Sequence, residues 1–108
     1  MTKNEAQRLC DKIAKHFAKD NAAKEQTIKD LQTLRNYFIE IKDPMITKIL
    51  RLIYEHLEKY ANFEIEIEDF EPDAEQSTFE YVMELIMNYD NKYNRDELQE
   101  IKSRLLEN

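Results

Sequence analysis

Hydrophobic residues nearly encircle one stretch of the chain, Pro44 to Ala61, whereas elsewhere they recur along one side of each predicted helix. At about 100° per residue, the apolar residues of this stretch cover roughly 200° of the helix circumference. Such a wide apolar surface needs cover from two or more neighbouring helices. Asp43 is a favourable N-cap, and Pro44 suits the first helical position, where no N–H is needed. The helix 44–61 is therefore predicted to be the centre of the fold.

Two helices are predicted before it. Thr2 and Glu5 form a capping-box pattern ahead of apolar residues at helical spacing, which indicates a helix over residues 3–19. A second amphipathic helix ends near Lys42. We favour a break between the two at Asp20–Asn21, although the phase of their apolar stripes also allows one long helix.

Two helices are predicted after it. Ser77 and Glu80 form a second capping box, and the apolar stripe that follows indicates a helix to about Tyr89. Asn94 and Glu97 form a third, which indicates a short final helix.

The chain contains no glycine. Phosphate-binding loops and tight two-residue hairpins therefore lack the residue on which they depend. The pattern favours an all-α fold: a single helical domain over residues 1–108, built as a compact bundle of about five helices around the helix 44–61.

Residues 62–72 fit two structures. Apolar and acidic residues alternate from Phe63 to Glu68, which is typical of a strand. Tyr60, Phe63 and Ile67 also continue the helical spacing of the preceding helix. A lone strand in a helical chain would have to pair across a dimer or with another protein. We favour an extended acidic segment and keep a helical extension as the alternative.

Charge is unevenly distributed along the chain. Residues 1–60 contain 12 Lys and Arg against 9 Asp and Glu, a net charge of +3, whereas residues 61–108 contain 4 against 14, a net charge of −10. Such a field attracts a basic partner and repels nucleic acid. The simpler interpretation is an acidic surface that prevents aggregation.

These features predict a small acidic protein–protein interaction module with a basic protein partner. One version is inhibition of a basic target, as small acidic helical immunity proteins or antitoxins do, an analogy that rests on size and charge. The predicted partner-binding residues combine carboxylates with apolar anchors: Glu64, Glu66, Glu68, Asp69, Glu71, Phe63, Ile65, Ile67 and Phe70.

The alternative is a self-assembling, homodimeric structural or regulatory protein. In it the acidic segment docks on a second basic surface of the partner copy, or two copies pair their residues 63–67 about a two-fold axis. That second basic surface follows the exposed side of the first helix: Arg8, Lys12, Lys15 and Lys19.

The sequence does not support an enzyme, a cofactor or a metal site. His56, at the rim of an apolar arc, and Cys10, on an apolar face, are interpreted as core or boundary residues. Residues 90–101 superficially match a calcium loop, but Arg95 stands at the required glycine and Ile101 at the bidentate glutamate. No apolar run reaches the ~20 residues of a membrane span. We therefore expect a cytoplasmic protein that binds neither membrane nor nucleic acid.

Overall fold

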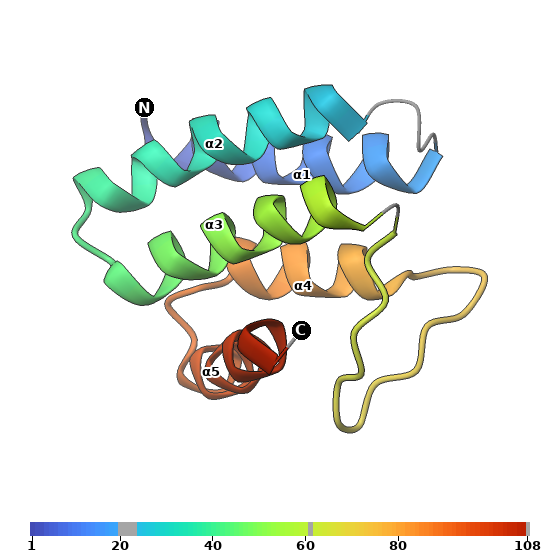
Figure 1. The fold of residues 1–108 in the computed structure, drawn as a ribbon. Helices are drawn as coiled ribbons and strands as arrows, with labels where there is room; N and C mark the ends of the chain where they lie inside the picture. Colours follow the sequence, from blue (N-terminus) through green and yellow to red (C-terminus); the bar gives the residue numbers. More distant parts are fainter. Residues whose placement is uncertain (20–23, 61, 108) are drawn as a thin grey trace.

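Five α-helices form the regular structure of the part of the chain that this computed structural model describes, residues 1–19, 24–60 and 62–107. They are α1 (Lys3–Lys19), α2 (Lys24–Glu40), α3 (Pro44–Lys59), α4 (Thr78–Met87) and α5 (Lys92–Glu107). No strand occurs among the residues described. The predicted all-α bundle is confirmed (Figure 1).

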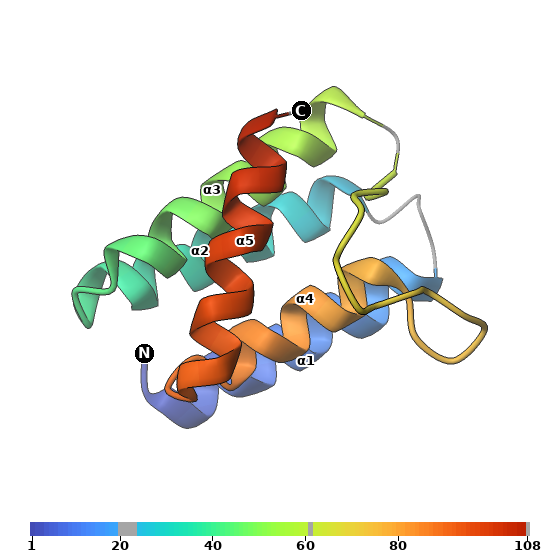
Figure 2. The ribbon, with the colours of Figure 1, turned by 90° about the horizontal axis from the view of Figure 1, so that it is seen from below.

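The helices pack as two antiparallel pairs with a fifth helix across them. α2 packs on α3 and α1 on α4, while α1 and α2 also lie side by side (Figure 1). α5 runs crosswise under α3 and α4, as Figure 2 shows from below. α3 is thus covered by both α2 and α5, and Ile46, Ile49 and Leu50 are fully buried along it. The cover predicted for this central helix is confirmed.

Asp43 and Pro44 begin α3 as predicted. The Asp43 carboxylate accepts a hydrogen bond from the Ile46 amide at 3.2 Å, and Pro44 occupies the first helical position. At the other end Tyr60 has an extended backbone, φ −119° and ψ 150°. Extension of this helix through residues 62–72 is therefore wrong. Its predicted last residue, Ala61, lies outside the described residues.

α2 ends earlier than predicted, at Glu40. Lys42 has a left-handed backbone, φ 59°, its amide donates to the Ile39 carbonyl at 3.1 Å, and the Asp43 amide donates to the Phe38 carbonyl at 2.9 Å. This pair of bonds is a Schellman motif, which stops the helix. The predicted break at Asp20–Asn21 lies outside the described residues, but α1 and α2 pack against each other, so one long helix is wrong.

The first two capping boxes are confirmed and the third is wrong. Thr2 and Glu5 exchange hydrogen bonds of 3.0 and 3.1 Å, as do Ser77 and Glu80. α4 ends at Met87, slightly before the predicted position. α5 begins earlier than Asn94 and is a 16-residue helix, not a short one.

Asn91 replaces the third box. Its side-chain oxygen accepts hydrogen bonds from the amides of Tyr93 at 2.9 Å and Asn94 at 3.2 Å. This asparagine satisfies free N–H groups at the start of α5 without the Glu or Gln that a capping box uses. The apolar stripe that reveals a helix starts later, at Leu98, so the pattern missed the first turns.

An ion pair joins the starts of α3 and α5. The Arg95 guanidinium donates to both Asp43 carboxylate oxygens, at 2.8 and 3.1 Å. Burial alone would raise the pKa of Asp43, but the hydrogen bonds from Arg95 and from the Ile46 amide outweigh it and leave the pKa lowered. Asp43 therefore serves both as the cap of α3 and as the anchor of α5.

Candidate protein-binding groove

The acidic segment leaves the end of α3 in an extended form, with alternating burial. Phe63 and Ile65 are 5% and 7% exposed, whereas Glu64 and Glu66 between them are exposed. Figure 1 shows the segment running away from α3 beside the start of α4. Because alternate side chains of an extended chain point to opposite sides, one side of this segment is fastened to the core and the other meets solvent.

Aromatic contacts hold the buried side of the segment. The Phe63 ring meets Phe79 of α4 edge-on, with centroids 5.5 Å apart, and meets His56 of α3 at 5.3 Å. Phe63 and Ile65, which the sequence suggested as anchors for a partner, thus attach the segment to its own domain. Their side chains position the neighbouring carboxylates.

A tight reversal follows, and it is docked on α4. The Phe70 amide donates to the Ile67 carbonyl at 3.3 Å, and Asp69 takes a left-handed backbone, φ 63°. The Phe70 ring stacks on Tyr81 at 4.1 Å, and the Tyr81 hydroxyl donates to Glu97 of α5. Burial of the Tyr81 hydroxyl, and next its hydrogen bond to the Glu97 carboxylate, raise the pKa of Tyr81. The tip of the segment is therefore fixed to α4, through a tyrosine that is itself bonded to α5.

A groove of about 690 Å³ opens between this segment, the start of α4 and the last turns of α5. Acidic residues line one side of it, and Arg104 of α5 is the basic residue among those that line it. The lining comprises Glu64, Ile65, Glu66, Ile67, Glu68, Phe70, Glu71, Pro72, Thr78 and Arg104.

Most of the predicted partner-binding residues meet in this groove. Asp69 and Phe63 are the exceptions: Asp69 is exposed at the reversal, and Phe63 is buried against α3 and α4. Thr78 and Arg104 were missed, because only the fold brings α4 and α5 to the segment. None of the four lining glutamates forms an ion pair with another described residue.

The second basic surface is partly neutralised by its own neighbours. The Nζ atom of Lys12 lies 3.6 Å from a carboxylate oxygen of Asp30 in α2. The Nζ atom of Lys15 lies 2.9 Å from a carboxylate oxygen of Asp11, one turn earlier in α1. Arg8 is exposed, and the side chain of Lys19 falls outside the described part. This surface therefore carries less free positive charge than its sequence suggests.

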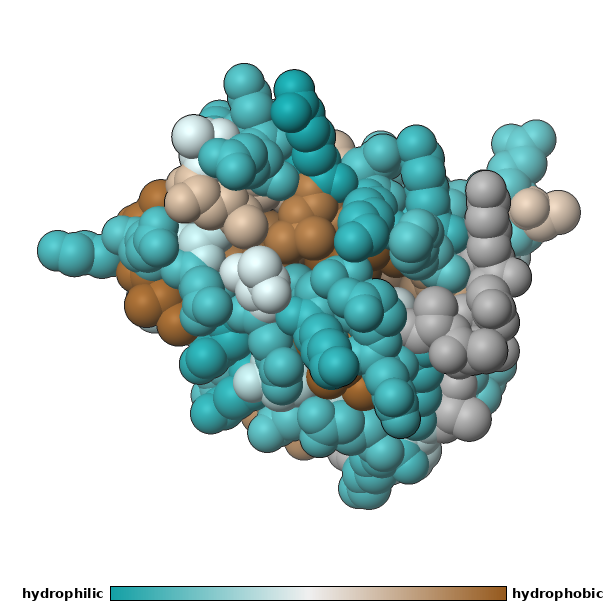
Figure 3. Space-filling view, turned by 90° about the horizontal axis from the view of Figure 1, so that it is seen from above, coloured by the Kyte–Doolittle hydropathy of each residue, from teal (hydrophilic) through white to brown (hydrophobic). Residues whose placement is uncertain are grey.

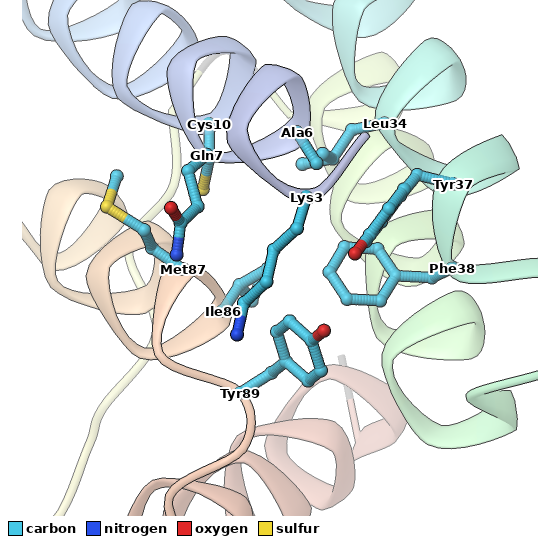
Figure 4. Close-up of a pocket in the computed structure, with 10 residues that line it drawn as sticks. All are labelled: Lys3, Ala6, Gln7, Cys10, Leu34, Tyr37, Phe38, Ile86, Met87 and Tyr89. Atoms are coloured by element: carbon cyan, nitrogen blue, oxygen red, sulfur yellow. The ribbon is translucent and has the colours of Figure 1, made fainter. Parts of the chain in front are cut away.

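A small cavity between α1, α2 and α4 is too small to hold a ligand (Figure 4). Its volume is about 10 Å³, which is room for about one water molecule. Cys10 lines it, and its thiol donates to the Met83 carbonyl at 3.1 Å. Burial raises the pKa of the Cys10 thiol to about 12, so the thiolate that reacts with electrophiles is scarce. The interpretation of Cys10 as a buried thiol is confirmed.

His56 is likewise enclosed. Its ring lies between Tyr60, at a centroid distance of 4.7 Å, and Phe63. Burial, and then the nearby positive charge of Lys59, lower the pKa of His56. The His56 ring thus forms part of the contact between α3 and the acidic segment.

Comparisons with protein-family models, with curated proteins and with solved structures find no match for this chain. None of the helices described is both long and apolar enough to cross a membrane. Within residues 1–19, 24–60 and 62–107, no three His, Cys, Asp or Glu side chains lie close enough together to hold a metal ion.

Proposed function

We propose that this protein is an interaction module whose acidic groove binds a basic segment of a partner protein. The observation that supports this most strongly is the groove itself. Four glutamates line it, namely Glu64, Glu66, Glu68 and Glu71, and Arg104 is the basic residue among its described lining. A complementary partner would be drawn in and oriented by this field.

The spacing of the carboxylates favours a polymeric cation over a metal ion. Glu64, Glu66 and Glu68 alternate along an extended chain, so neighbouring members are roughly 7 Å apart. Ca²⁺ needs its oxygen ligands at 2.3–2.6 Å from one centre. Lysine or arginine side chains at intervals along a peptide match this spacing better.

Binding also fits the groove better than catalysis does. Cys10 and His56, the residue types most often used as nucleophile or base, are buried elsewhere and do not line it. Apolar side chains of Ile67 and Phe70 border it beside the carboxylates. Apolar contacts give affinity and flanking charges give association rate and orientation.

Self-assembly remains the second candidate, favoured by a small apolar area. Figure 3 shows a mostly hydrophilic face over α1 and α2, with hydrophobic surface toward the end at which α2 finishes. Ile39 and Ile41 at that end are 48% and 40% exposed. A stable interface uses about 20–30 residues a side. These two isoleucines support self-association less than the groove supports partner binding.

The test is capture of a partner from lysate of the source organism, followed by association kinetics at several salt concentrations. The wild-type chain is compared with the triple variant Glu64→Gln, Glu66→Gln, Glu68→Gln. A matched control, Glu25→Gln, Glu58→Gln, Glu100→Gln, removes the same charge from exposed sites on α2, α3 and α5.

A basic protein should be captured by the wild type and the control and lost by the groove variant. Its association with the groove variant should be slower and less dependent on salt, because screening then has less attraction to remove. Equal capture and equal salt dependence for all three chains would refute the proposal. Light scattering on the wild type would show self-association if the second candidate holds.

A further inference from the structure

We infer that the partner binds as an extended basic strand that pairs with the main chain of residues 64–68, and this inference rests on the proposed function. Five consecutive residues of the acidic segment line the groove, from Glu64 to Glu68. A strand that turned one side-chain face to a groove would line it with alternate residues. Residues of both orientations line it, which is the pattern expected of a groove that follows the edge of the backbone.

From residue 62 to residue 66 that backbone edge has no backbone partner within the described chain. No backbone–backbone hydrogen bond joins residues 62–66 to one another or to any other described segment, and the first such bond beyond them is at the reversal, from Phe70 to Ile67. An unpaired edge of this kind is what peptides use when they add a strand to a protein. The backbone hydrogen-bonding groups of residues 62–66 are thus available for strand addition, whereas the Ile67 carbonyl already accepts from the Phe70 amide.

The volume of the groove suits such a strand. A strand in a sheet takes about 160 Å³ per residue, from a rise of about 3.3 Å, a strand spacing of about 4.8 Å and a sheet spacing of about 10 Å. The groove, at about 690 Å³, therefore has room for a short stretch of extended chain.

The negative charge of the groove favours a basic strand as its occupant. Residues on an added strand lie directly opposite Glu64, Glu66 and Glu68, with Cβ atoms about 4.5–5.5 Å apart. Lysine or arginine at every second position would face these carboxylates. A second copy of this segment would instead place glutamate opposite glutamate, which is destabilising. The structure therefore favours a basic strand from another protein over pairing of two copies.

The test uses the full chain and an acetylated, amidated heptapeptide, Lys-Thr-Lys-Val-Lys-Thr-Lys, titrated by calorimetry. A second peptide has N-methyl groups on the backbone nitrogens of its two inner lysines and its two threonines. These groups remove backbone N–H donors from both edges of the peptide strand. A control peptide carries the same number of methyl groups on lysine Nζ, which keeps the charge and all backbone N–H groups. Amide hydrogen exchange of residues 63–68 is followed in parallel.

The unmodified and Nζ-methylated peptides should bind with similar affinity, and backbone methylation should weaken binding at least tenfold, because two or more hydrogen bonds are lost. Bound peptide should slow exchange at alternate amides of residues 63–68, since alternate N–H groups of a strand share an edge. Equal binding of all three peptides, or uniform protection, would overturn strand pairing while leaving the proposed function. Failure of all three to bind would overturn the proposed function as well.

Discussion

Replacement of Asp43 by alanine tests whether one carboxylate holds both α3 and α5. The Asp43 side chain is 10% exposed and accepts the Ile46 amide together with two bonds from Arg95, whose side chain is 36% exposed. Loss of the N-cap bond costs about 1 kcal/mol. Loss of a charged, bidentate hydrogen bond costs about 1.5–3 kcal/mol, and the exposure of Arg95 places it near the low end.

We therefore expect Asp43→Ala to lower the free energy of unfolding by about 2–3 kcal/mol. For a domain of this size that corresponds to a fall in Tm of about 8–12 °C, at about 4 °C per kcal/mol. Asp43→Asn keeps an acceptor for the cap but loses the charge, so it should cost about half as much. Because the pKa of Asp43 is lowered in the fold, this stability is present above its ordinary value of 3.8 and is lost as pH falls through the folded value.

Urea and thermal unfolding, followed by circular dichroism, measure these costs. A double-mutant cycle with Arg95→Ala separates the cap from the ion pair, and a coupling energy of about 1 kcal/mol is expected for the pair. A cost below about 0.5 kcal/mol for Asp43→Ala would refute the reasoning. So would strict additivity of the two substitutions, since residues that share these bonds should couple.

Two further changes test the backbone and the enclosed histidine. Lys42→Gly should raise the free energy of unfolding by about 0.5–1 kcal/mol, because the backbone of residue 42, at φ 59°, suits glycine. Lys48→Gly, inside α3, should lower the free energy of unfolding by about 1 kcal/mol. Equal effects of the two substitutions would count against a strained turn at residue 42. The pKa of His56 is lowered in the fold, so the unfolded chain takes up this proton first and stability should fall as pH drops through about 6.5. His56→Gln should flatten that part of a Tm-against-pH curve relative to His16→Gln, and identical curves would contradict the enclosure argument.

Local sequence patterns were enough to predict the helices and the central position of α3. The near-encircling apolar surface of α3 required two neighbours, and α2 and α5 supply them. The capping boxes at Thr2 and Ser77 marked true helix starts, because both partners of a capping box lie within one turn. Such short-range interactions form in the same way wherever the helix is placed.

The groove could be predicted only in part, because it depends on contacts between distant residues. Glu64, Glu66 and Glu68 were identified by their alternation and charge, which are local properties. Thr78 and Arg104 complete the groove through packing of α4 and α5, and no sequence spacing reports that packing. The same limit applies to Phe63, whose ring could be assigned to the core only after Phe79 and His56 were seen around it.

The pairing of α1 with α4 has a consequence for the order of folding. The Cys10–Met83 bond spans 73 residues, whereas the Arg35–Thr47 bond between α2 and α3 spans 12. By the (3/2)RT ln n relation, closing the longer loop costs about 1.6 kcal/mol more in chain entropy. We expect the α2–α3 hairpin to form first. Folding kinetics of point mutants should then give high kinetic φ-values for contacts between α2 and α3 and low ones for contacts between α1 and α4; the reverse pattern would contradict this order. The acidic segment links the hairpin to α4, so the groove would be completed in the last step of folding.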